Sequence, residues 1–140
     1  MSDGNDFLKS MSIATSGLRA QAGRMRVISE NIANADSTAK TAGGNPYRRK
    51  IPTFSSELDR AIDSRVVSLG KIKTDTSDFR VRHEPGNPAA DANGNVKYPN
   101  VNSLVEMTDM REAQRSYEAN LNIISATRRM IQRTLDILKA

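Results

Sequence analysis

The chain has 140 residues, of which 37% are hydrophobic and 4% aromatic, and its net charge is +5. A chain this short, with so few aromatic side chains, predicts one domain, or one domain with an insertion, in which long helices pack through narrow apolar seams. Because the chain contains no cysteine, its composition excludes disulfides, thiol catalysis and thiolate metal sites.

The first predicted element is a helix over residues 7–35. Apolar or small residues recur in this stretch at alternating intervals of three and four, and a glutamine takes the one polar place. A heptad seam of this length is typical of a helix that packs along another helix. The seam consists of Met11, Ala14, Leu18, Gln21, Met25, Ile28, Ile32 and Ala35.

The middle of the chain, residues 36–100, is predicted to be a loop followed by a small β-rich insertion. Residues 36–46 are small and polar, and all five prolines lie between residues 46 and 99. Strand-like runs occupy residues 47–54, 65–73 and 78–83. The step Asn93-Gly94 favours a tight hairpin turn after the last of these runs.

The last predicted element is a helix over residues 103–138. Ser103 and Glu106 have the spacing of a capping box at its start. The heptad interval again alternates between three and four, and Ile123, Met130 and Ile137 widen the apolar stripe on one side. The predicted seam consists of Met107, Met110, Gln114, Tyr117, Leu121, Ile124, Arg128, Ile131, Leu135 and Leu138.

The two predicted helices, in residues 1–35 and 101–140, are expected to form one core domain with a coiled-coil-like packing. The fold class is therefore mainly α with a small β insertion. The apolar seams fit an intramolecular core and a polymerisation surface about equally well. The unequal lengths of the helices favour the second reading, because the longer helix must expose part of its seam.

Residues that carry chemistry are sparse. His83 is the only histidine, so a histidine cluster that binds a metal is excluded, and no nucleophile motif flanks it. The segment Asp91–Asn95 has a faint likeness to a calcium loop, but its glycine falls two places early and no glutamate closes it. No glycine-rich phosphate-binding loop is present, and the sequence predicts neither an enzyme nor a cofactor.

Three short motifs near the N-terminus occur together with three near the C-terminus. The first set is Ser16–Ala20, Asn31–Ala35 and Tyr47–Lys50, and the second is Pro99–Asn102, Glu106–Met107 and Ala113–Asn120. Together, in this order, they resemble the terminal motifs of the flagellar rod and hook protein family. The long loop that places Pro46 before Tyr47, and the turn Glu84–Pro88, are most similar to the proximal rod members.

This resemblance implies a structural subunit of the periplasmic drive-shaft that transmits torque. It implies assembly with copies of itself and with other proximal and distal rod proteins. Contacts with basal-body ring and export-gate adaptor proteins, and export by the flagellar type III apparatus, are also implied. The N-terminus has no positive region followed by an apolar one, so we expect export without a cleaved signal peptide. No apolar run approaches the length of a membrane span, and the spread of the charge along the chain favours no nucleic-acid partner.

The subunit interface is predicted to include seam residues of both helices and polar residues after the first helix. Asn31 and Asn34 share one face of the last helical turn, and their amides can bond free carbonyl groups or the backbone of a neighbour. We predict a polar clasp between subunits; the alternative is that Asn34 ends the helix and Asn31 faces solvent. The predicted interface comprises Met11, Leu18, Met25, Ile28, Asn31, Ile32, Asn34, Tyr47, Arg48, Met107, Tyr117, Asn120, Leu121, Ile124, Ile131 and Leu135.

Two alternatives of other classes stay open. The isoelectric point near 9.8 and the five arginines of the last helix suggest a nucleic-acid-binding protein, although five carboxylates in the same helix nearly cancel them. A cell-wall hydrolase is the second alternative. It would need a pair of catalytic carboxylates, which the sequence does not reveal, and the middle segment is too short for a separate catalytic domain.

Overall fold

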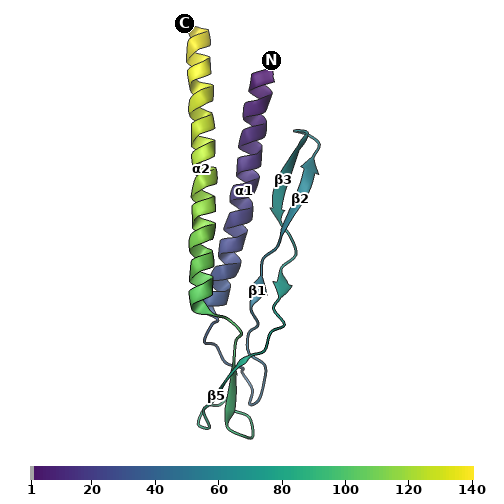
Figure 1. Ribbon diagram of the computed structural model, residues 1–140, viewed down its shortest axis with the longest axis vertical. Coiled ribbons are helices and arrows are strands. Elements are labelled where there is room, and N and C mark those ends of the chain that lie inside the picture. The colour runs from purple at the N-terminus through teal and green to yellow at the C-terminus, as the bar shows by residue number, and fades with distance from the viewer. Residues whose placement is uncertain (1) are drawn as a thin grey trace. The chain divides into compact units, whose positions relative to one another are not determined.

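A computed structural model describes residues 2–140 of the chain (Figure 1). Along the sequence, one long helix precedes six short strands and a second long helix follows them, so the predicted fold class is confirmed. Neither helix of the described chain is long and apolar enough to cross a membrane. The elements are α1 (Ser2–Ala33), β1 (Lys50–Ile51), β2 (Phe54–Asp59), β3 (Ser64–Leu69), β4 (Lys73–Thr74), β5 (Arg80–His83), β6 (Asn95–Tyr98) and α2 (Ser103–Lys139).

The chain forms two compact units, and each long helix contributes to both. The first, which we call the helical unit, contains α1 up to Met25, the segment Thr53–Lys71 and α2 from Glu112 onward. The second, which we call the junction unit, contains Arg26–Pro52 and Ile72–Arg111. The middle of the sequence therefore supplies residues to both units.

In the helical unit, α1 and α2 run antiparallel. Phe7 lines the same apolar groove as Ile131, and further along Arg24 forms an ion pair with Glu112 at 3.6 Å. Figure 1 shows α1 in this unit between α2 and the β2–β3 hairpin. The predicted packing of the two terminal helices is thus observed in this unit.

Two glycines let the neighbours of α1 approach its backbone closely. A Cβ atom at Gly17 would lie 3.0 Å from the side-chain amide of Asn120 on α2. A Cβ atom at Gly23 would lie 2.8 Å from a methyl carbon of Leu69 on β3. Glycine lowers helix propensity by about 1 kcal/mol relative to alanine, and close packing on two sides explains why α1 contains it.

The buried face of α2 differs from the predicted seam by one residue at every second position. Met110, Tyr117, Ile124 and Ile131 are partly buried, as expected. Met107 and Leu121, however, are 52% and 41% exposed. At four positions of the predicted seam, Met107, Gln114, Leu121 and Arg128, the preceding residue faces inward instead. These inward-facing residues are small or polar: Glu106, Ala113, Asn120 and Thr127.

The reason for this difference is the close approach of α1. Ala14, Gly17 and Ala20 supply small groups on α1, and Ala14 and Ala20 are buried. Because these small side chains let α2 come close to α1, the space between the helices holds Ala113 and Asn120 but not a second row of large apolar side chains. A seam predicted from hydrophobicity alone therefore places the inward-facing residue one position too late in the sequence at these turns.

The junction unit contains two small antiparallel pairs. β1 pairs with β4, with Lys50 opposite Thr74. β5 pairs with β6, from Arg80 opposite Tyr98 to His83 opposite Asn95. β1 is shorter than the predicted strand because Pro52 follows it, and proline has no N–H to donate to a ladder.

The connection between β5 and β6 is longer than the predicted hairpin turn. It runs from Glu84 to Gly94, and the N–H of Glu84 donates to the carbonyl oxygen of Gly94 at 2.8 Å. Gly94 has φ of +78°, whereas Asn93 does not have positive φ. A type I′ turn needs positive φ at both central residues, so this pair ends the loop and does not form a two-residue turn.

The start of α2 also differs from the prediction. Asn102 caps the helix, because its Oδ1 accepts hydrogen bonds from the N–H groups of Leu104 at 3.1 Å and Val105 at 3.4 Å. Ser103 is therefore the first helical residue and not the cap. The side chain of Glu106 is used elsewhere, and the expected capping box is wrong.

Candidate functional site

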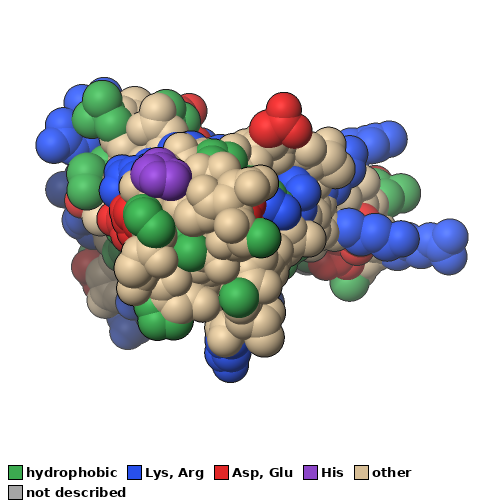
Figure 2. All heavy atoms as spheres, turned by 90° about the horizontal axis from the view of Figure 1, so that it is seen from below, with side chains coloured by type: hydrophobic (Ala, Val, Ile, Leu, Met, Phe, Trp, Pro, Cys, Tyr) green, Lys and Arg blue, Asp and Glu red, His purple; other side chains and the backbone are tan. Residues whose placement is uncertain are grey.

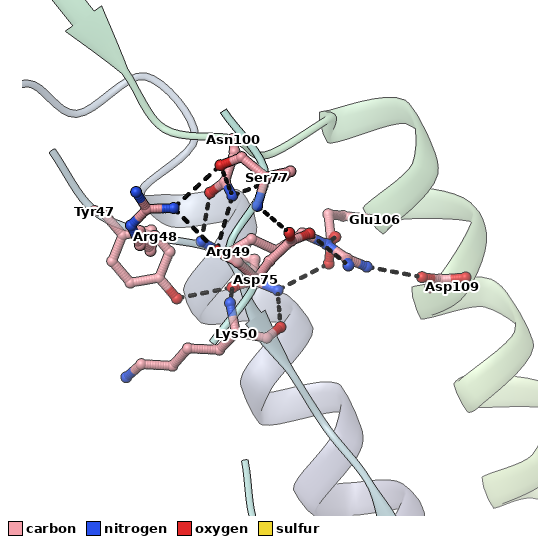
Figure 3. Close-up of polar contacts among 10 residues, drawn as sticks. Tyr47, Arg48, Arg49, Lys50, Asp75, Ser77, Asn100, Glu106 and Asp109 are labelled. Carbon is pink, nitrogen blue, oxygen red and sulfur yellow. Dashed lines mark hydrogen bonds and ion pairs between the residues drawn. The ribbon is translucent and has the colours of Figure 1, made fainter. Parts of the chain in front are cut away.

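The centre of the junction unit is a polar cluster around Asn31 at the end of α1. Figure 3 labels its other main members, among them Tyr47, Arg49 and Glu106. The side chain of Asn31 is fully buried. Its Nδ2 donates to the carbonyl oxygen of Lys50 at 2.8 Å and to Oε2 of Glu106 at 3.1 Å. Its Oδ1 accepts from the Tyr47 hydroxyl at 2.8 Å and from the Lys50 N–H at 2.9 Å.

An asparagine amide offers two donor hydrogens and two acceptor lone pairs. All four are therefore used inside the subunit. Asn31 joins the end of α1, strand β1 and α2 within this unit. The alternative that Asn31 faces solvent is wrong. A contact of Asn31 with a neighbouring subunit stays a prediction, although its amide group is fully used within this chain.

Asn34 has a more local function. Its Nδ2 donates to the carbonyl oxygen of Glu30 at 2.8 Å, one of the last carbonyl groups of α1. Just beyond the helix, the guanidinium group of Arg80 donates to the carbonyl oxygen of Ala35 at 2.8 Å. The same carbonyl oxygen of Glu30 also accepts the backbone N–H of Asn34 at 3.1 Å, so the side chain adds a second hydrogen bond to it. A contact of Asn34 with a neighbouring subunit stays a prediction.

Glu106 on α2 and Arg49 before β1 form the charged part of the cluster. Glu106 is 1% exposed, and its Oε1 accepts a hydrogen bond from Nε of Arg49. The same guanidinium group lies 3.6 Å from Asp75 and 3.8 Å from Asp109. A buried carboxylate needs a partner of opposite charge, and Arg49 supplies it.

The backbone around Arg49 is fixed as well. Its N–H donates to Oδ1 of Asn100 at 2.8 Å, and its carbonyl oxygen accepts from the N–H of Asp75 at 2.9 Å. The amide of Asn100 donates in turn to the carbonyl oxygens of Asp75 and Ser77. Arg48 donates to the same two carbonyl oxygens. Asn100 and Arg48 therefore hold the β4–β5 connection against β1.

The pKa values follow from these contacts. Burial lowers the pKa of Arg49, but its hydrogen bond to Glu106 and the three nearby carboxylates outweigh this effect and raise it. Hydrogen bonds from the backbone and hydroxyl of Ser77 lower the pKa of Asp75, and the charge of Arg49 adds to this. Both groups are thus held in their charged forms.

The cluster also balances the most basic run of the sequence. Arg48, Arg49 and Lys50 are three cations. Lys50 pairs with Glu30, and Arg49 lies beside three further carboxylates. The guanidinium group of Arg48 stacks over the ring of Phe79 at 4.1 Å. These groups are occupied by intramolecular contacts, which disfavours the nucleic-acid alternative for this segment.

Tyr47 gives the cluster a measurable response to alkaline pH. Burial, together with the charges of Glu30 and Glu106, raises its pKa to about 12 from an ordinary value of 10.0. The stabilising contribution of the neutral hydroxyl is complete below pH 10.0 and is lost as pH rises toward 12. We predict that Tyr47→Phe flattens the loss of stability over this range, measured by urea unfolding at stepped pH.

A matched variant separates Tyr47 from the general effect of high pH. Tyr98 also has a raised pKa because its hydroxyl bonds Glu84, so a change of stability in wild type at alkaline pH does not by itself report on Tyr47. Tyr117 belongs to the helical unit, and Tyr117→Phe serves as the control. An identical pH profile for wild type and Tyr47→Phe would contradict the assigned hydroxyl contact.

The arrangement provides structural contacts and no catalytic set. Among residues 2–140 no three metal-binding side chains come together. The histidine of the chain, His83, is exposed on β5 (Figure 2) and contacts Asn95 rather than the cluster. The contacts of the cluster are structural: they keep two helix ends and a loop in one position.

The predicted interface residues fall into three groups. Asn31, Tyr47 and Arg48 belong to the cluster, and Asn34 lies beside it. Met107, Leu121 and Leu135 are exposed. The others are half-buried or buried along the two helices: Met11, Leu18, Met25, Ile28, Ile32, Tyr117, Asn120, Ile124 and Ile131.

The sequence did not indicate several members of the cluster. Arg49, Asn100 and Glu106 each belong to one of the quoted motifs, and that was the available signal for them. Asp75 and Asp109 lie in no motif, and only the folded chain brings them to Arg49. Charged residues far apart in sequence carry no local sign of pairing.

Comparisons with known proteins agree with this architecture. The model of the flagella basal body rod protein matches residues 11–39. The model of the C-terminal region of the flagellar basal body rod FlgEFG protein matches residues 92–137. The two matches include most of α1 and most of α2. The chain is therefore a flagellar basal-body rod protein.

Similarity to individual rod proteins assigns the chain to one family within this class. The flagellar basal-body rod protein FlgC of Agrobacterium fabrum is 56% identical over 91% of this chain and 92% of its own length. The FlgC proteins of Bacillus subtilis and Salmonella typhimurium are 40% and 37% identical, over 93% and 94% of this chain and 97% of their own lengths. The chain belongs to the FlgC family. It is a structural subunit of the proximal rod and not an enzyme.

Proposed function

We propose that this subunit polymerises with other rod subunits through its terminal helices, and that the resulting tube transmits torque as the periplasmic drive-shaft. The observation that carries this proposal is the long helix pair, in which α2 keeps large apolar residues at the surface. Met107, Leu121 and Leu135 are all exposed. Apolar side chains repeated along a helix lose contact with water only when another surface covers them.

The helical parts of residues 1–35 and 101–140 act in this proposal as one assembling core domain. A surface that docks head to tail makes heterologous contacts, and such contacts generate helical filaments when the rotation does not close. The junction cluster keeps the ends of the two helices in one geometry. A subunit that passes on torque needs such rigid connections between its elements.

The partners in this proposal are copies of the same chain, the other proximal and distal rod proteins, and the ring and export-gate adaptor proteins at the ends of the rod. The subunit reaches the periplasm through the flagellar type III apparatus and keeps its N-terminal segment. Both ideas rest on the family and on the motifs at the two ends of the chain.

A deletion strain tests the proposal directly. Cells without the chain should lack rods and swimming, and a plasmid copy should restore both. Basal bodies purified from the restored strain should contain the chain, and mass spectrometry of its N-terminal peptide should find no cleavage. Restored swimming with the chain absent from purified basal bodies would contradict the structural function.

A substitution on the exposed face of α2 tests the helical contact. Leu121→Asp should abolish rod assembly and motility, because a carboxylate without a partner in a packed interface costs several kcal/mol. The chain should still be exported and should fold, since this side chain is 41% exposed in the subunit. The measurement is basal-body yield together with the amount of exported chain.

Leu121→Met is the matched control, because it keeps an apolar side chain of similar volume. It should support swimming like the wild type. Normal rods in the Leu121→Asp strain would mean that this face of α2 stays in contact with solvent.

A further inference from the structure

Two of the sequence motifs meet in the helical unit. The N-terminal motif Ser16–Ala20 lies on α1, and the C-terminal motif Ala113–Asn120 lies on α2. A Cβ atom at Gly17 would lie 3.0 Å from both Nδ2 and Oδ1 of Asn120, so this side chain lies directly against the backbone of α1. The cluster around Asn31 includes no residue of either motif, and their contact therefore has another function.

The side chain of Asn120 is held in this position by its own helix. Its Nδ2 donates to the carbonyl oxygen of Ser116 at 3.0 Å, one turn earlier on α2. A movement of the amide away from α1 would break this partly buried hydrogen bond. A side chain at position 17 must therefore displace either the fixed amide of Asn120 or α2 itself, because the space between the helices is already filled.

The contact between Gly17 and Asn120 also determines which side of α2 is exposed. Asn120 faces α1, whereas the next residue, Leu121, is 41% exposed. One residue turns an α-helix by about 100°, so a rotation of α2 by this angle would exchange the two side chains. Leucine is larger than asparagine, and Asn120 already fills the space beside Gly17. The glycine therefore selects the rotation of α2 that places Asn120 inside and Leu121 outside.

The preceding residue, Ser16, holds the β2–β3 hairpin. Its hydroxyl accepts the backbone N–H of Val67 on β3 at 3.3 Å and donates to the carbonyl oxygen of Ile13 at 2.7 Å. In the helical unit α1 lies between α2 and this hairpin (Figure 1). The outer edge of a hairpin strand carries N–H groups without a strand partner. The hydroxyl of Ser16 satisfies one of them and fixes the position of β3 along α1.

We propose that Ser16 and Gly17 are the positioning residues of the helical unit. Gly17, together with Asn120, sets the register and rotation of α2 on α1, and Ser16 sets the register of the hairpin. Consecutive residues of a helix point in directions about 100° apart, which lets two adjacent residues position neighbours on two sides. This inference goes beyond the proposed function, because the contacts lie within one subunit.

An exchange of side-chain size between Gly17 and Asn120 tests the first contact. Alanine favours a helix over glycine, so Gly17→Ala would raise the urea midpoint of the purified chain if position 17 were open. We expect it to lower the midpoint. Asn120→Ala in the same chain should restore stability, because the smaller side chain makes room for the new methyl group. Additive effects of the two substitutions would overturn the inference.

Gly4→Ala is the matched control, because it makes the same change on the same helix. A Cβ atom at Gly4 would meet no neighbouring group within 4 Å among the described residues. This variant should not lower the urea midpoint, and its effect should add to that of Asn120→Ala. A decrease as large as that of Gly17→Ala would show that Asn120 is not the cause, and would overturn the inference.

A distance measurement separates positioning from stability. Because the chain contains no cysteine, Ala22→Cys and Asn122→Cys place one spin label on each helix, at exposed positions. Gly17→Ala should shift or broaden the distribution of distances between the labels, and the further change Asn120→Ala should return it to that of the labelled parent. A distribution unchanged by Gly17→Ala would mean that the contact does not set the register.

Hydrogen exchange tests the contact of Ser16. Ser16→Ala should speed exchange of the Val67 amide about tenfold or more, because the N–H loses its acceptor. Ser12→Ala is the control: Ser12 faces the hairpin across a groove of about 430 Å³, without a hydrogen bond to it in the part of the chain that the structure describes. Exchange of the Val67 amide at the wild-type rate in Ser16→Ala would overturn this part of the inference. All these measurements use the free chain, so their failure would leave the proposed function standing.

Discussion

Glu106→Ala should destabilise the junction unit by about 3 kcal/mol, the lower end of the range for breaking a buried ion pair. The carboxylate is 1% exposed and bonds both Arg49 and Asn31. Its removal leaves the Arg49 guanidinium group without its closest partner and one Asn31 hydrogen without an acceptor. Arg49 keeps weaker contacts with Asp75 and Asp109, so the effect stays below the upper end of that range. Urea unfolding of the purified chain measures it.

Glu106→Gln is the matched control for this experiment. The amide keeps the shape of the side chain and an acceptor oxygen, but it lacks the charge that pairs with Arg49. It should therefore lose less stability than Glu106→Ala. In cells, swimming should decrease in the same order. A free energy of unfolding unchanged by Glu106→Ala would contradict the assigned pairing, because the removal of one partner should leave the charge of Arg49 uncompensated.

The two long helices could be predicted from sequence because their signal is local. A three–four interval of apolar residues needs only neighbours in the chain to be recognised. The predicted ranges, 7–35 and 103–138, agree with α1 and α2 within a few residues except at the start of α1. The side of α2 that faces inward was harder, because it depends on the shape of α1. Glu106, Ala113 and Thr127 are buried without being large apolar residues.

The pairing of the short strands β1 and β4, by contrast, could not be predicted from the sequence. β1 and β4 have two residues each, and no pattern of alternating side chains can be recognised over two positions. Their pairing depends instead on Arg49, whose N–H and carbonyl group bond Asn100 and Asp75. These contacts join residues more than twenty positions apart. Such long-range polar contacts are fixed by the folded chain and leave no periodic signal in the sequence.

The candidate site could be predicted in part. Asn31, Tyr47 and Arg48 were predicted as interface residues on the strength of their motifs, and the structure brings them together. It uses Asn31 within the subunit, however. A motif indicates that a residue type is required at a position, but it does not tell whether the required contact is made within one chain or with another.

The two asparagines at the end of α1 should respond very differently to substitution. Asn31→Ala removes four hydrogen bonds at a fully buried position. It leaves the N–H and carbonyl group of Lys50 unpaired, and each unpaired buried group costs about 1–3 kcal/mol. We expect a loss of about 3 kcal/mol in the free energy of unfolding, measured with urea, and a strong decrease in basal-body yield.

Asn34→Ala is the natural comparison, because it changes the same residue type three positions later. It removes one hydrogen bond, to the carbonyl oxygen of Glu30, at a partly exposed position. Alanine also has the higher helix propensity. The two effects oppose each other, so stability should change by less than about 1 kcal/mol. If Asn34→Ala nevertheless abolished rods while the free chain kept its stability, Asn34 would make a contact with a neighbouring subunit. Equal losses of stability in the two variants would instead contradict the central position assigned to Asn31, because only a shared structural function could produce them.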